Sequence, residues 1–149
     1  MTTNYLEKLK DIINNGENIF ITGGGGVGKS YLLNQLKSYY KDDLQITSTT
    51  DISAINIGGQ TLHSWAGIGI ADKPIPEVVK KIKRKPTLFK QIITCKKLAI
   101  DEVSMLDNIT MEYVDNVLKI LRENNKPFGG IQVILVGDFF NCHLLKLNK

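Results

Sequence analysis

A run of four glycines separates a short apolar segment from an amphipathic one in the first quarter of the chain. Residues 18–22 before it are β-prone, and Leu32, Leu33 and Leu36 after it have helical spacing. A strand, a glycine loop and a helix in this order are typical of parallel α/β proteins. The segment fits the pattern G-x-x-x-x-G-K-[ST] and comprises Gly23, Gly24, Gly25, Gly26, Val27, Gly28, Lys29 and Ser30.

The rest of the chain alternates strand-like and helix-like segments. Strands are predicted at residues 44–49, 97–100 and 131–138, and helices at residues 6–13, 77–83 and 107–123. Strands that alternate with helices predict an α/β fold with a mainly parallel sheet and helices on both faces. Residues 50–69 are rich in Gly, Ser and Thr, and we expect Trp65 within them to be a core residue.

The glycine loop has a direct chemical use. Backbone N–H groups of a glycine-rich turn can surround phosphates without side chains in the way, and the dipole of the following helix favours anions. We expect Lys29 to bridge the β- and γ-phosphates of a nucleotide and Ser30 to hold Mg²⁺.

Acidic residues follow two of the predicted strands. Asp101 and Glu102 come at the carboxyl end of an apolar strand, the edge where open α/β sheets bind ligands. Beside a phosphate-binding loop, Asp101 would hold Mg²⁺ and Glu102 would orient and deprotonate the attacking water. Asp138 and Asn141 follow the last strand, which would place one of them near the γ-phosphate.

Two other classes of protein compete with this interpretation. The glycines also satisfy the dinucleotide-binding pattern G-x-G-x-x-G, with Asp51 following the second strand, but that alternative leaves Lys29 and Ser30 unexplained. Small-molecule kinases clamp the transferred phosphate with several arginines, whereas this chain has only Arg84 and Arg122. Adjacent Asp and Glu residues also suit activation of water better.

Positive charge is concentrated in one stretch of the sequence. Residues 72–97 hold nine basic and two acidic residues, so the other residues hold ten basic and thirteen acidic ones. This stretch is either a solvated helix face or a surface that contacts polyanions. No apolar run approaches the roughly 20 residues of a membrane span, and charged residues interrupt the amino terminus where a secretion signal would be apolar. We therefore expect an intracellular protein without a membrane segment.

The cysteines and histidines do not suggest a metal centre. Cys95 and Cys142 are the only cysteines, and with His63 and His143 they show no paired ligand spacing. We expect reduced thiols and no zinc site.

Four segments carry a more specific signal because they occur together and in order. They are NIFITGGGGVGKS from residue 18, NIGGQTLHSWAGIG from residue 56, LAIDEVSMLD from residue 98 and FGGIQVILVGDFF from residue 128. The chain thereby resembles the Pif (petite integration frequency) family of superfamily-one DNA helicases. The resemblance implies that residues 1–149 form the amino-terminal part of a RecA-like P-loop motor domain. It also implies ATP-dependent movement 5′ to 3′ on single-stranded DNA, in DNA repair, recombination or replication.

The resemblance also implies cofactors and site residues. ATP and Mg²⁺ would be the cofactors, and single-stranded DNA the partner, at an intracellular site of DNA metabolism. The implied residues are Lys29, Asp101 and Glu102 for catalysis, Gly23 to Ser30 for the nucleotide, Ser30 and Asp101 for Mg²⁺, and Thr61 and His63 for DNA.

Some residues depart from the family pattern. Asp51 stands where the family usually has Gly, and Asn141 where it usually has Gln. The second motor domain, which carries an arginine finger in this family, is expected to lie outside these 149 residues and to be encoded separately. The fold is therefore expected to be incomplete, and the chain by itself to bind ATP without rapid turnover or unwinding. The alternative is a truncated, non-hydrolysing module that binds nucleotide and single-stranded DNA.

Overall fold

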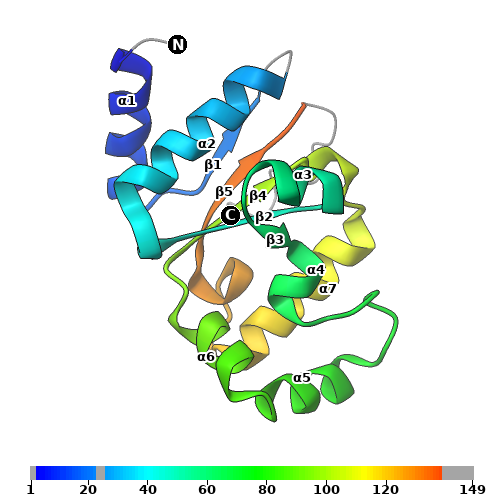
Figure 1. Cartoon of the computed structure of the whole chain (residues 1–149). Helices are drawn as coiled ribbons and strands as arrows, with labels where there is room; N and C mark the ends of the chain where they lie inside the picture. The colour runs from blue at the N-terminus through cyan, green and yellow to red at the C-terminus, as the bar shows by residue number, and fades with distance from the viewer. Residues whose placement is uncertain (1–2, 23–25, 139–149) are drawn as a thin grey trace.

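Five parallel strands form one sheet in the order β1-β5-β4-β2-β3 (Figure 1). The computed structural model describes residues 3–22 and 26–138. The strands are β1 (Ile19–Ile21), β2 (Leu44–Ser48), β3 (Gln60–Thr61), β4 (Lys97–Asp101) and β5 (Gln132–Val136). Every paired neighbour is parallel, so the carboxyl ends of all five strands lie at the same edge of the sheet.

Helices cover both faces of this sheet, as the sequence predicted (Figure 1). The α-helices are α1 (Thr3–Asn14), α2 (Gly26–Tyr40), α3 (Asp51–Asn56), α4 (Leu62–Ala66), α5 (Ile75–Lys83), α6 (Pro86–Thr94) and α7 (Asn108–Leu121). Three short 3₁₀ turns complete the description: η1 (Lys41–Asp43), η2 (Val103–Met105) and η3 (Pro127–Gly130).

Two apolar layers hold the helices to the sheet. Along β4, Leu98 and Ile100 pack into the layer under α4 to α7, whereas Ala99 packs into the layer under α1 and α2. All three side chains are fully buried. This alternation follows from the two-residue period of a strand, and burial on both faces explains why β4 and β5 are nearly continuous apolar runs.

The α/β class, the parallel sheet and the core position of Trp65 are confirmed, but the sequence missed several short elements. Trp65 is fully buried in α4. The missed elements are α3, β3, α4 and α6. Helix α6 begins at Pro86, since proline is tolerated in the first turn of a helix.

The structure also bears on the thiol chemistry. Cys95 is a free, buried cysteine, and burial raises the pKa of its thiol to about 11. Within the described ranges no group of three or more His, Cys, Asp or Glu side chains is placed to hold a metal ion. None of the helices in the same ranges has the length and apolar content that crossing a membrane requires. Cys142 and His143 lie outside the described residues.

Candidate nucleotide-binding site at the carboxyl edge of the sheet

The strand registers bring the predicted site residues to one edge. Ser48 at the end of β2 pairs with Asp101 at the end of β4 on one side and with Thr61 of β3 on the other. On the far side of β4, Ile100 pairs with Leu135 of β5, two residues before Gly137. Segments that are far apart in the sequence therefore end side by side. Parts of all four recognised motifs meet there, since the start of α2 belongs to the first motif.

Lys29 lies in the first turn of α2 and reaches the end of β5. Its Nζ is 2.9 Å from Oδ1 of Asp138, and the two side chains are 14% and 55% exposed. Gly26 is the first residue of α2, so the second half of the glycine motif forms a helix amino terminus as the phosphate-binding interpretation requires. Gly23, Gly24 and Gly25 lie outside the described residues.

Asp101 is the buried acid of the site, at 7% exposure. Burial raises the pKa of its carboxyl group, while a hydrogen bond from the backbone N–H of Glu102 (2.9 Å to Oδ1) and the charge of Lys29 oppose that rise. A buried carboxylate is costly unless a cation or donors surround it. Together with the hydroxyl of Ser30 in α2, Asp101 offers oxygen ligands of the kind that Mg²⁺ prefers. These residues therefore fit a nucleotide-bound Mg²⁺.

Glu102 has an unusual backbone conformation. Its side chain is exposed, and its φ and ψ of 55° and 39° lie in the left-handed region, which costs a non-glycine residue free energy. Two bonds from the end of β2 hold the turn: the Thr49 hydroxyl donates to the Glu102 carbonyl (2.9 Å), and the Thr49 N–H donates to the Asp101 carbonyl (3.3 Å). Strain that is maintained in this way is a mark of functional turns.

The close approach of the residues after β5 to this turn favours a residue without a side chain. A Cβ on Gly137 would lie 3.1 Å from the backbone nitrogen of Val103, immediately after Glu102. Glycine at this position therefore lets the chain bring Asp138 past the acidic turn and up to Lys29.

Thr61 and His63 lie at the start of α4, two strands away from Asp101. The Thr61 hydroxyl accepts a hydrogen bond from the N–H of Ser64 (3.1 Å) and so caps α4. His63 is partly exposed and close enough to Asp107 to affect it electrostatically. The pKa of Asp107 is lowered, chiefly by its bond from the Thr110 backbone N–H and less by the charge of His63. With neighbouring strands about 4.8 Å apart, Thr61 and Asp101 are separated by roughly 10 Å.

Sequence reasoning missed Thr49, which joins the second strand to the acidic turn. The available signal was a run of hydroxyl residues, Thr47, Ser48 and Thr49, at the end of a predicted strand. Thr47 and Ser48 are fully buried and donate to the carbonyls of Ala99 and Asp101. Asn141, the other predicted phosphate-sensing residue, lies outside the described residues, whereas Asp51 is exposed in the first turn of α3.

A parallel sheet that places a helix-start lysine beside a buried strand-end acid defines the class of P-loop nucleotide-binding domains with a RecA-like fold. The sequence places the chain more narrowly. Residues 5–145 match the model of the PIF1-like helicase family, so the chain belongs to that family.

Named relatives agree with this assignment. The chain is 42% identical to the ATP-dependent DNA helicase PIF1 of Emericella nidulans over 139 residues, which are 89% of the chain and 19% of the relative. It is 43% identical to the ATP-dependent DNA helicase RRM3 of Saccharomyces cerevisiae over 134 residues, which are 87% of the chain and 18% of the relative. The chain thus spans about a fifth of the length of these proteins.

Solved structures share the fold. The Pif1 helicase of Candida albicans superposes with a TM-score of 0.83 at 38% identity, over 93% of this chain and 33% of that one. A Bacteroides Pif1 helicase in complex with ADP-AlF3 and ssDNA superposes with a TM-score of 0.78 at 34% identity, over 93% and 32% of the two chains. The parallel sheet and its helical layers are therefore those of a Pif1 motor domain.

Proposed function

We propose that this chain is the amino-terminal, ATP-binding part of a DNA helicase motor that moves 5′ to 3′ on single-stranded DNA. The observation that carries the proposal is the meeting of Lys29, Asp101, Glu102 and Asp138 at one sheet edge. Membership of a family whose relatives are named ATP-dependent DNA helicases favours ATP over a dinucleotide or a kinase substrate. The function lies at an intracellular site of DNA repair, recombination or replication.

Each residue of the edge has a distinct task in ATP hydrolysis. Lys29 exchanges its contact with Asp138 for the β- and γ-phosphates, and the amino terminus of α2 adds its dipole. Ser30 and Asp101 would hold Mg²⁺, which would neutralise charge on the phosphates. Glu102, exposed and fixed by Thr49, orients the attacking water and accepts its proton.

DNA binding is proposed at the neighbouring end of the same edge. Thr61 and His63 lie at the start of α4 beside β2, and β2 is followed directly by Thr49, whose hydroxyl donates to the carbonyl of Glu102. A shift of β2 on DNA binding would therefore move the group that positions water. A second motor domain would complete the motor by closing against this edge.

The test is whether ATP and single-stranded DNA affect each other's binding to the 149-residue chain. Labelled oligo(dT) is titrated with and without Mg²⁺ and a non-hydrolysable ATP analogue, and the analogue with and without oligo(dT). Thermodynamic linkage requires the two affinities to change by the same factor. We expect a reciprocal change that Lys29→Ala abolishes and a loss of oligo(dT) affinity in His63→Ala. Independent binding of the two ligands, or absence of oligo(dT) binding at low salt, would refute the proposal.

A further inference from the structure

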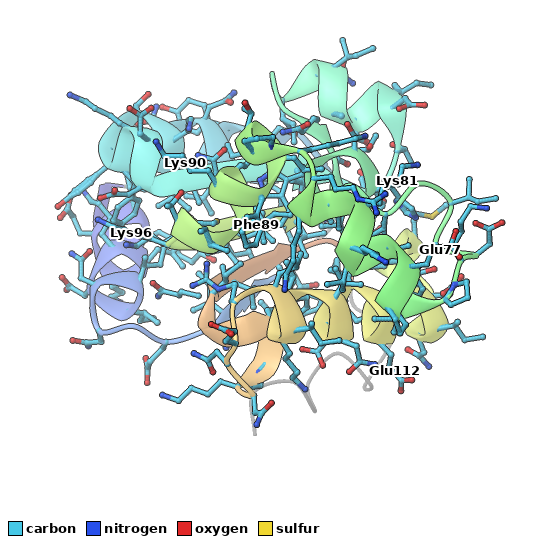
Figure 2. The ribbon with its side chains drawn as sticks, turned by 90° about the horizontal axis from the view of Figure 1, so that it is seen from below. Glu77, Lys81, Phe89, Lys90, Lys96 and Glu112 are labelled. Atoms are coloured by element: carbon cyan, nitrogen blue, oxygen red, sulfur yellow. The ribbon has the colours of Figure 1, made fainter. Side chains whose placement is uncertain are left out.

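The basic stretch of the sequence folds into a surface that the nucleotide site does not use. Helices α5 and α6 and the turn between them pack on α7 and leave their outer sides to solvent (Figure 2). The α5–α6 surface consists of Lys80, Lys81, Lys83, Arg84, Lys85 and Lys90, all of them exposed. Figure 2 shows Lys81 on α5, Lys90 on α6 and Glu112 on α7 well apart from one another, with Glu77 of α5 the labelled residue nearest to Lys81 in this view.

This surface carries few acidic groups, since Glu77 is the one acidic residue among residues 75–94. None of the six basic side chains forms an ion pair within the described residues. The next basic residues along the chain differ, because Lys96 pairs with Asp43 at 3.5 Å and Lys97 lies over the Tyr40 ring at 5.0 Å. The basic side chains of α5 and α6 thus lack an ion-pair partner in the described part of the chain, whereas Lys96 and Lys97 each contact a side chain where the chain returns to the sheet.

Helix stability accounts for only part of this charge. Lys80, Lys81 and Lys83 lie in the last turn of α5, where they complement the helix dipole. Lys85, however, is the N-cap residue of α6, where a positive charge opposes the helix dipole. Lys90 lies in the middle of α6, away from either end, so the helix dipole does not stabilise its charge. A binding partner of opposite charge would account for the remainder.

The shape and chemistry of the surface select the kind of partner. Sites for single-stranded nucleic acid combine basic residues with aromatic side chains on which bases stack. The α5–α6 surface has no exposed aromatic residue, since Phe89 is half-buried against the core layer. Duplex DNA keeps its bases inside and presents one phosphate charge per roughly 1.7 Å of helix axis. Basic residues without aromatic partners fit that backbone.

The surface is also continuous with the proposed single-strand site. The Gln91 side chain of α6 donates to the Trp65 carbonyl of α4 at 3.0 Å, and α4 begins next to Thr61 and carries His63. Tyr113 of α7 donates to the Lys73 carbonyl at 2.6 Å and so holds the segment that leads into α5. DNA that leaves α4 therefore meets a fixed basic surface.

We propose that the α5–α6 surface contacts the phosphate backbone of duplex DNA next to the single strand held at the sheet edge. The inference extends the proposed DNA-binding function and rests on it for the position of the single strand. It assigns the surface a backbone contact without sequence preference, because lysine and arginine contacts to phosphates do not read bases.

The test compares two double variants of equal charge change. Lys81→Gln/Lys90→Gln removes two charges from the surface, and Lys8→Gln/Lys41→Gln removes two from exposed positions elsewhere. Binding of a labelled 20-base-pair blunt duplex is measured from 50 to 200 mM salt, with oligo(dT) in parallel. Each lost phosphate contact lowers the slope of log affinity against log salt by about 0.9. Duplex affinity falls as the salt is raised over this range. We expect this fall to be about tenfold smaller for the surface variant than for wild type, and the same for the control variant as for wild type.

Three results would overturn the inference. Equal slopes for the two double variants would show that the surface makes no specific contribution. An equal change for oligo(dT) would assign it to the single-strand path. If poly-glutamate displaces the labelled duplex as well as unlabelled duplex of equal charge does, the surface fits an acidic protein partner instead. A wild-type chain that binds no duplex at 50 mM salt but retains nucleotide-linked oligo(dT) binding would also refute this inference, while leaving the proposed function intact.

Discussion

Asp101 shows how the chemistry of the site conflicts with the stability of the fold. The native state binds a proton at Asp101 more readily than the unfolded chain does, because burial raises the pKa of this carboxyl group. Its contribution to stability is therefore largest below the unfolded pKa of about 3.9 and is lost as the pH rises through the native value. At neutral pH the ionised side chain destabilises the fold, and its retention is explained by a function that needs the charge.

Asp101→Asn should separate these two roles. Asparagine keeps an oxygen that can accept the Glu102 N–H but carries no charge, so the melting temperature at pH 7 should rise by a few degrees. The gain should shrink at acidic pH, because wild-type Asp101 becomes protonated as the pH falls through its raised pKa. Mg²⁺-dependent binding of ATP should weaken in the same variant. Thermal melts at pH 7 and at acidic pH check this, and a variant that is less stable than wild type at pH 7 would contradict the account.

The backbone conformation of Glu102 can be tested by substitution. Its left-handed backbone favours glycine, whereas a left-handed conformation costs other L-residues about 1–2 kcal/mol. Glu102→Gly should therefore be more stable to urea than Glu102→Ala by about 1 kcal/mol, although both lack the carboxylate. If alanine proves as stable as glycine in equilibrium unfolding, the turn does not store strain in the folded chain.

The elements that sequence could predict are those with strong periodicity. The strands β4 and β5 are apolar runs of five residues, and α7 buries one regular face, including Met111, Val114 and Leu118. The elements that it missed have two to nine residues and depend on tertiary contacts. The short helices α3 and α4 rely on caps from Thr50 and Thr61. A threonine can be recognised as a cap only when the residues after it are known to form a helix.

The placement of the edge strand β3 beside β2 can be tested by substitution. Gly59 precedes β3 and runs so close to β2 that a Cβ on it would lie 2.4 Å from the carbonyl oxygen of Ile46. Gly59→Ala should therefore displace β3 and α4, cost about 1–3 kcal/mol of unfolding free energy and weaken oligo(dT) binding. Nucleotide binding should persist because Lys29 and Asp101 belong to other elements.

Gly16→Ala is the matched control for this variant. Gly16 has a φ of +83°, but no atom lies within 4 Å of a Cβ added to it. Alanine there should destabilise the chain through backbone strain while leaving oligo(dT) affinity unchanged. Equal losses of oligo(dT) affinity in the two variants would mean that β3 has no particular part in DNA binding.

At the scale of the whole molecule, the site was predictable because parallel strands must end at one edge. The sequence placed Lys29, Asp101 and Asp138 at strand or helix ends, and the fold brings Lys29 and Asp138 to within 2.9 Å. The contact from Thr49 to Glu102 was not predictable, since it depends on the order of β2 beside β4 in the sheet. Spacing along the chain carries no information on that order.

Neither arginine of the chain is placed to act at this edge. Arg122, at the carboxyl end of α7, donates to the carbonyls of Gly129 (2.8 Å) and Ile92 (2.7 Å). Arg84 lies on the α5–α6 surface. An arginine finger is worth about 10³- to 10⁵-fold in rate. We therefore expect the 149-residue chain to hydrolyse ATP very slowly and to unwind no forked duplex. Steady-state turnover of several per second that Glu102→Gln abolishes would contradict this.

Equilibrium binding of a fluorescent ATP analogue shows whether the carboxyl edge of the sheet is an ATP site. Wild type, Lys29→Ala and the surface control Lys8→Ala are titrated with Mg²⁺ and again with excess chelator. A charged hydrogen bond contributes about 1.5–3 kcal/mol, so Lys29→Ala should bind the analogue about 10- to 100-fold more weakly. Lys8→Ala should match wild type, and chelation should weaken both. Equal affinity of wild type and Lys29→Ala would contradict the account.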